Sequence, residues 1–146
     1  HPGIKMELLE APEAVCVVPK GHPLAAKKEI DIKDLMGEQV IPLMRGHNSR
    51  HRLEELFAAE GHIPEFRIET STIEMACVLV EQGLGITIVN AITAERHRKL
   101  GVEVIPFRHP MNYAYAFAFP AGKPPSEITR IFVSYIKKFV DDKSAS

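Results

Sequence analysis

Residues 70–90 read TSTIEMACVLVEQGLGITIVN and carry the signals of a helix followed by a strand. The opening hydroxyl residues predict a helix N-terminus, and Glu74 lies three residues after Ser71, the spacing of a capping box. Apolar residues then recur at helical spacing, and Gly83 predicts the end of the helix. The almost wholly apolar residues 84–89 indicate a strand that is buried on both faces. The segment therefore predicts one helix-to-strand unit of an α/β fold.

The same alternation of strands and helices extends over the rest of the chain. Short apolar or β-branched segments predict strands at residues 14–19, 40–43, 66–69, 102–107 and 113–119. Helical spacing and capping residues predict helices at 49–60, 90–98 and 126–140, with one helical turn at 31–36. Ser49 is the expected N-cap of the first of these helices. Strands that alternate with helices predict an α/β fold with a mainly parallel sheet.

Composition excludes two classes of partner for this segment. The 146 residues fit one domain of ordinary size, and 18 basic against 19 acidic residues give a net charge of −1. A surface that binds DNA phosphates needs an excess of clustered Lys and Arg, so we expect this segment alone to bind DNA poorly. No stretch approaches the ~20 apolar residues of a membrane-spanning helix, so no membrane association is expected.

The residues that suggest catalysis or metal binding do not form a complete set. Gly83-Leu84-Gly85 follows a helix and opens a strand, whereas a dinucleotide fingerprint follows a strand and opens a helix. His47 and His51 are four residues apart, but neither Cys nor carboxylate completes a ligand spacing. Cys16 and Cys77 lie in apolar runs and are expected to be reduced core thiols, which suits a reducing cytoplasm. We therefore expect no enzyme, no metal and no cofactor.

Two polar loops remain as candidates for ligand binding. Residues 43–50 and 69–72 each leave a predicted strand and open a helix. In open α/β sheets, ligands bind beyond the carboxyl ends of strands, where helix N-termini offer free N–H groups to anions. Arg45 or Arg50 could add a bidentate clamp, while the hydroxyls could instead be plain helix caps. The candidate binding residues are Leu43, Met44, Arg45, Asn48, Ser49, Thr70 and Ser71.

Two segments resemble one family. Residues 15–25, Val-Cys-Val-Val-Pro-Lys-Gly-His-Pro-Leu-Ala, are similar to the strand–Pro–x–x–HPLA segment of LysR-type transcriptional regulators. Residues 80–90, Val-Glu-Gln-Gly-Leu-Gly-Ile-Thr-Ile-Val-Asn, are similar to the V-x-x-G-x-G-I turn of the same family. The ending Val89-Asn90 and the loop around Arg45 resemble the branch that includes LysR itself and the opine regulators. The resemblance runs from about residue 6 to residue 140.

The resemblance implies a fold. Family members join a winged helix-turn-helix to an effector-binding domain of two α/β lobes, similar to type II periplasmic binding proteins. Residues 1–18 would be the end of the first lobe and a crossover strand, 19–115 a complete second lobe, and 116–146 the return crossover and a helix that packs on the first lobe. Because most of that lobe lies outside these residues, the apolar stripe of helix 126–140 should be exposed and favour association.

The resemblance also implies a function. The segment would be the effector-binding domain of a cytoplasmic regulator that senses a small metabolite, an amino acid or a derivative of one. Tyr115, on the return crossover, joins the candidate binding residues. DNA would be bound only through a helix-turn-helix outside these residues, and a homodimer or homotetramer is expected. The alternative is the solute-binding component of a transport system, which shares the two-lobed architecture.

Overall fold

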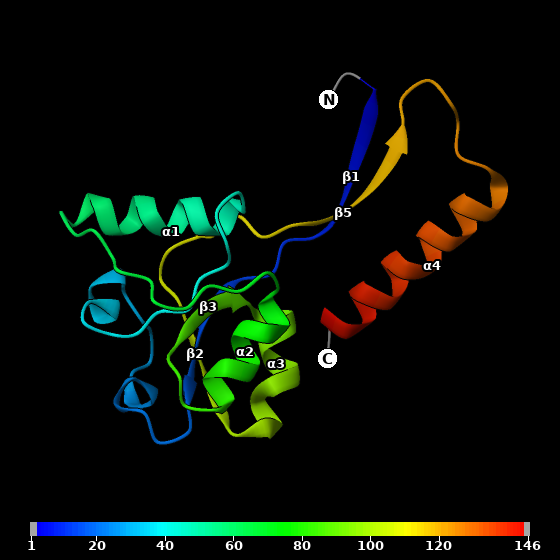
Figure 1. Ribbon diagram of the computed structural model, residues 1–146. Coiled ribbons are helices and arrows are strands. Elements are labelled where there is room, and N and C mark those ends of the chain that lie inside the picture. The colour runs from blue at the N-terminus through cyan, green and yellow to red at the C-terminus, as the bar shows by residue number, and fades with distance from the viewer. Residues whose placement is uncertain (1–2, 145–146) are drawn as a thin grey trace. The chain divides into compact units, whose positions relative to one another are not determined.

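The computed structural model describes residues 3–144, which form two compact units (Figure 1). One unit is continuous and runs from Pro12 to Tyr113. The other combines the described residues 3–11 with residues 114–144. The lobe boundaries expected from the family resemblance, after residues 18 and 115, stay a prediction about the whole protein.

The central strand of the continuous unit is antiparallel to both of its neighbours. Strand β2 (Ala14–Pro19) lies between β3 (Thr87–Asn90) and β4 (Val102–Pro106) and pairs antiparallel with each. The expected mainly parallel sheet is therefore wrong for these strands. An apolar run reports that a strand is buried, but the run is the same whichever way the strand points.

Within residues 3–144, parallel pairing is confined to isolated bridges beside the three strands. These bridges are Ile30 with Phe107, Val40 with Ile86, and Leu43 with Thr70. The predicted strand at 40–43 is reduced to the bridges of Val40 and Leu43, so that prediction is wrong in extent. The predicted strand at 66–69 is wrong, because among the described residues the only bridge there is made by the following residue, Thr70. Pro42 has no N–H to donate to a ladder, which limits regular pairing at this point.

The two faces of β2 contact two separate clusters of buried side chains. Cys16 and Val18 belong to a cluster that includes Leu53 and Phe57 of α1 (Asn48–Ala59). Val15 and Val17 belong to a second cluster with residues of α2 (Ile73–Glu81) and α3 (Ala91–His97). Figure 1 shows α2 and α3 together beside β2 and β3. Because side chains alternate along a strand, one strand supports helices on both faces.

The segment 70–90 folds largely as predicted. Helix α2 ends in a Schellman motif, in which Gly83 N–H donates to Val80 O at 2.9 Å and Leu84 N–H to Leu79 O at 3.1 Å. The N-cap, however, is Thr72, whose hydroxyl accepts from Met75 N–H at 3.2 Å. The capping box expected between Ser71 and Glu74 is therefore wrong: the N-cap lies one residue later, and the residue three positions after it, Met75, has no carboxylate that could complete a box.

Three short 3₁₀ helices complete the continuous unit, at Pro23–Ala26, Ile32–Leu35 and Arg98–Leu100. Asp31 caps the second, as predicted, because its side chain accepts from Lys33 N–H. Asp34 completes a reciprocal capping box by accepting from Asp31 N–H at 2.9 Å.

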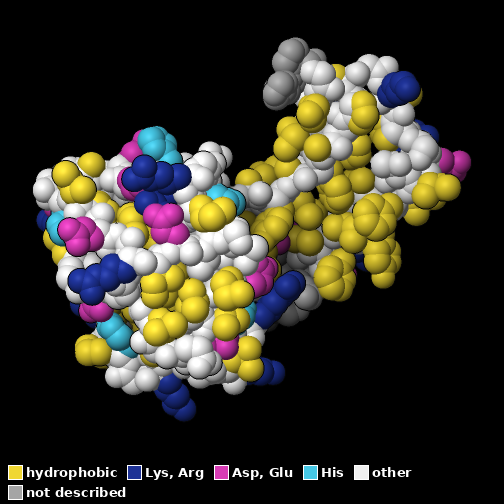
Figure 2. Space-filling view, viewed as in Figure 1, with side chains coloured by type: hydrophobic (Ala, Val, Ile, Leu, Met, Phe, Trp, Pro, Cys, Tyr) yellow, Lys and Arg dark blue, Asp and Glu magenta, His cyan; other side chains and the backbone are white. Residues whose placement is uncertain are grey.

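The second unit is a strand pair with one long helix. Strand β1 (Ile4–Glu10), which was not predicted from the sequence, pairs antiparallel with β5 (Tyr115–Pro120). Helix α4 (Glu127–Ser144) follows. Figure 2 shows hydrophobic side chains gathered over this unit. The exposed side chains of α4 include Ile128, Ile131, Phe132 and Tyr135, so the expected exposure of its apolar stripe is confirmed.

Gly85→Ala should destabilise the continuous unit. A Cβ at this position would lie 2.3 Å from Gln39 O, the same atom that accepts from Ile86 N–H at 2.9 Å. Overpacking against backbone predicts a loss of about 2–3 kcal/mol in the free energy of unfolding, measured by urea denaturation. Gly61→Ala is the control, because its Cβ would meet no atom within 4 Å and only its positive φ adds a cost. Equal losses in the two variants would contradict the steric explanation.

The chain studied alone should associate through α4. An apolar patch of several hundred Å² commonly marks a surface that becomes covered. Light scattering after size exclusion should give a mass that rises with protein concentration, and Ile131→Lys with Phe132→Lys should abolish the rise. Lys138→Gln changes an exposed polar position of the same helix and should leave the association intact. A concentration-independent monomer mass for the unmodified chain would refute this expectation.

Candidate functional site

The two candidate loops begin side by side. Met44 N–H donates to Thr70 O at 2.8 Å, and Thr70 N–H donates to Pro42 O at 3.1 Å. This exchange forms the parallel bridge between Leu43 and Thr70. The predicted adjacency of the loops is confirmed, and α1 and α2 each start a few residues later. Seven of the eight candidate residues lie in this region, whereas Tyr115 belongs to β5 of the other unit.

Helix α1 begins without a side-chain cap. Its first residue is Asn48, and its N-cap is His47, which makes no capping hydrogen bond. The prediction that Ser49 caps this helix is therefore wrong, because Ser49 is already inside the first turn. The amides of the first turn keep their hydrogen-bonding capacity, and the positive end of the helix dipole lies here. Such a helix start favours a bound carboxylate or other anion.

Arg45 is the cation that this loop leaves free. It is exposed, and no ion pair or hydrogen bond of its side chain occurs within residues 3–144. It borders a hollow of about 440 Å³ whose other lining residues are Gly46, His47, Asn48, Arg50, His51 and Glu54. Arg45 could therefore supply a guanidinium to a ligand at the start of α1.

Arg50, by contrast, is buried and already paired. Its side chain is 3% exposed, and it forms ion pairs with Glu54 at 2.7 Å and Glu69 at 2.9 Å. It also donates to Leu43 O at 3.1 Å. Burial opposes its charge, but the hydrogen bonds to the two carboxylates outweigh burial and raise the pKa of Arg50. Of the two arginines considered as ligand clamps, only Arg45 has a free guanidinium.

The hydroxyl residues of the second loop differ in availability. Thr70 is buried, and its Oγ1 donates to Thr72 O at 3.0 Å. Thr72 caps α2. The exposed Ser71 makes no side-chain hydrogen bond in the described part of the chain, so its hydroxyl is the more accessible one. The role of each residue in binding stays a prediction.

Two residues of the first loop were not among the candidates. Gly46 has a φ of 97°, which glycine adopts readily, and it turns the chain between the bridge and α1. His47 follows as the N-cap. A glycine between a predicted strand and a predicted helix was the available signal for this turn.

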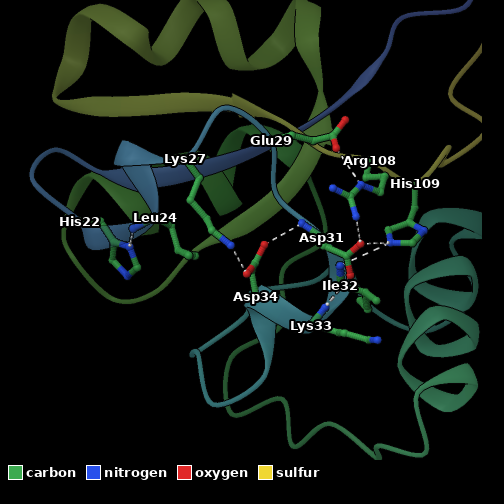
Figure 3. Close-up of polar contacts among 10 residues, drawn as sticks. All are labelled: His22, Leu24, Lys27, Glu29, Asp31, Ile32, Lys33, Asp34, Arg108 and His109. Atoms are coloured by element: carbon green, nitrogen blue, oxygen red, sulfur yellow. Dashed lines mark hydrogen bonds and ion pairs between the residues drawn. The ribbon is translucent and has the colours of Figure 1, made fainter.

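A second polar cluster lies where the segment 27–34 meets the end of β4 (Figure 3). Arg108 pairs with Glu29 and Asp31, each at 2.7 Å, and Lys27 pairs with Asp34. The N–H of Lys33 and the Arg108 guanidinium hold the pKa of Asp31 below its usual value. Because these charged groups pair with one another, the cluster connects the segment 27–34 to the residues after β4 and does not resemble a ligand site.

The cysteines have the properties of core residues. Cys16 and Cys77 are free and fully buried, and burial raises the pKa of each thiol to about 12. Within residues 3–144, no group of three or more His, Cys, Asp or Glu side chains is placed to hold a metal ion. No helix of this part of the chain is both long and apolar enough to cross a membrane.

Known relatives match nearly the whole length of this chain. Residues 1–141 match the family described as the LysR substrate binding domain. The transcriptional activator protein LysR of Escherichia coli (strain K12) is 32% identical over 91% of this chain and 42% of its own length. The regulatory protein NocR of Agrobacterium tumefaciens (strain T37) is 30% identical over 90% of this chain and 44% of its own. The chain thus spans less than half of each of these relatives.

Solved structures show the same fold. A putative LysR family transcriptional regulator from Pseudomonas aeruginosa superposes with a TM-score of 0.79 at 22% identity, over 97% of this chain and 50% of the other. The effector-binding domain of BenM with benzoate gives 0.76 at 20% identity, over 100% and 67%. That of QuiR with shikimate gives 0.74 at 23% identity, over 97% and 68%. The fold is therefore the type II periplasmic-binding-protein-like fold of LysR effector domains.

Both thiols should resist modification while the chain is folded. At pH 8 a thiol whose pKa is about 12 is almost wholly protonated, and the protonated form is not the nucleophile. Ellman's reagent should therefore label neither Cys16 nor Cys77 in buffer and both in guanidinium chloride. Rapid labelling of either residue in buffer would show that its burial is transient or incomplete.

Proposed function

The chain belongs to the LysR substrate-binding domain family, and on that basis we propose that it is the effector-binding part of a transcription regulator. The whole protein would bind DNA through a helix-turn-helix outside these residues and act in the cytoplasm as a homodimer or homotetramer. Residues 19–115 would form the second lobe of its effector domain. The protein would have no catalytic activity, in keeping with relatives that are transcriptional regulators.

The observation that carries the proposal is the uncapped start of α1 beside the free Arg45. This loop combines unpaired amides, the positive helix end and an unpaired guanidinium next to the second loop. The site suits a small molecule with a carboxylate. Benzoate and shikimate, found with two structural neighbours, are both carboxylates. An amino acid or a derivative is the class we propose for this chain.

Each candidate residue has its own role in the proposed site. Arg45 binds the carboxylate, with amides of the first turn of α1 as further donors. Asn48, Ser49 and Ser71 add hydrogen bonds, and Leu43 and Met44 form an apolar wall. Thr70 holds the loop, and Tyr115 would contribute from the return crossover. Contacts from both lobes would favour a closed form and shift an existing equilibrium toward it.

A transport component is the weaker alternative. It would use the same two-lobed fold to capture a solute. The curated relatives named above are regulators, which favours control of transcription.

A thermal-shift screen of the full-length protein tests the proposal. The panel holds the twenty amino acids and small organic acids, with benzoate and shikimate included. A ligand at about 100 times its Kd should stabilise the folded state by ~2.7 kcal/mol. Arg45→Ala and Ser49→Ala should each lower the affinity for the ligand that stabilises the protein most. For Arg45→Ala the loss should be about tenfold to a hundredfold, because a charged hydrogen-bond donor is removed.

Arg67→Ala is the matched control, because Arg67 is an exposed arginine outside both loops. Its affinity should equal that of the unmodified protein. If Arg45→Ala and Ser49→Ala bound the same ligand with unchanged affinity, the site would be wrong. Turnover of a panel compound would instead revive an enzymatic function.

A further inference from the structure

We propose that Arg50 is a positioning residue that fixes the two candidate loops to each other and keeps Arg45 free for an anion. The link to ligand binding rests on the proposed function, whereas the effects on the loops and on Arg45 do not. Arg50 itself would not touch the ligand.

The contacts of Arg50 join three parts of the chain. The side chain leaves the first turn of α1 and pairs with Glu54 one turn later. Its Nη1 donates both to Leu43 O, at the start of the first loop, and to Glu69 Oε1, at the start of the second. Its guanidinium carbon lies 4.4 Å from the centre of the Phe66 ring. One side chain thus holds both loops against the helix that they border.

The location of this arginine conflicts with local helix preferences. A cation in the first turn lies at the positive end of the helix dipole, where an acidic residue is favoured. Burial of the charge adds a desolvation cost that only good pairing offsets. Such departures from local rules are expected at functional or strained sites. The planar guanidinium reaches several acceptors at once, which a lysine ammonium cannot reproduce.

The ion pairs of Arg50 also decide whether Arg45 finds a carboxylate partner within the chain. Glu54 and Glu69 border a hollow of about 320 Å³ that Arg45 borders as well. Both carboxylates are engaged by Arg50, and each is still more than a third exposed. Without Arg50 these carboxylates would be available to Arg45, and an internal ion pair would replace the free cation. Arg50 therefore preserves the attraction of the loop for an anion.

The first readout is local amide exchange in the 146-residue chain, compared between the unmodified protein, Arg50→Met and Arg50→Lys. The amides of Met44 and Thr70 make the hydrogen bonds between the loops, and those of Cys16 and Val17 report on β2. Both variants should exchange about tenfold faster at the loop amides, with β2 unchanged, as expected of a local opening. Unchanged exchange at Met44 and Thr70 in both variants would overturn the proposal.

The second readout is the rate at which phenylglyoxal modifies Arg45, mapped by mass spectrometry against Arg67 as the internal reference. In Arg50→Met, Arg45 should react about threefold more slowly, because a partly exposed ion pair now holds its guanidinium. Adding Glu54→Gln and Glu69→Gln should restore the original rate. Arg50→Lys should retain a faster rate than Arg50→Met, because the ammonium still attracts the carboxylates, and this variant keeps the test valid if Arg50→Met does not fold.

A purely structural role predicts different results. Exchange would then rise by the same factor at β2 as at the loops, and Arg45 would react as fast as or faster than in the unmodified chain. Either result would refute the positioning role. Neither readout uses an effector, so a negative metabolite screen would leave this inference standing, and its failure would leave the proposed function standing.

Discussion

The burial of β2 on both faces is the constraint on which the continuous unit depends. Its side chains alternate between two clusters, and every residue from Ala14 to Val18 is buried. Packing on one face places α1, and packing on the other places α2 and α3. Since the candidate loops lead into α1 and α2, the position of the site follows from how these helices pack against the sheet. A strand with one solvated face would support only one of the two layers.

The sequence predicted those parts of the fold that local signals determine. The strand at 14–19, the helix after Thr72 and its end at Gly83 follow from apolar spacing and capping chemistry. The direction of β2 could not be predicted, because its burial pattern is the same for either direction. The apolar run at 40–43 predicts a longer strand than the chain forms, because Pro42 cannot donate to a ladder. Strand β1 was not predicted, although apolar residues alternate along it at Ile4, Met6 and Leu8.

In the candidate site, too, some features could be predicted from the sequence and others could not. The general rule for α/β sheets predicted that the two loops would meet, and the bridge between Leu43 and Thr70 confirms it. The sequence could not predict that Arg50 is paired and Arg45 is free, because the pairing of Arg50 involves Glu69, a residue nineteen positions away. An arginine looks the same in a sequence whether it faces a ligand or a carboxylate of its own chain. Only the tertiary pairing distinguishes the two.

The connection between the units has a consequence for how this protein can be rearranged. The continuous unit begins after β1 and ends before β5. Glu10 and Tyr115, which lie close to its two ends, are paired in the sheet of the other unit. Within the unit, Phe107 N–H donates to Ala14 O at 3.0 Å, close to where the segment enters. Residues 12–113 are therefore an insertion into a two-stranded hairpin. Because the two ends of the insertion join neighbouring residues of the hairpin, another segment whose own ends lie equally close together could take its place without a change in the pairing of β1 with β5.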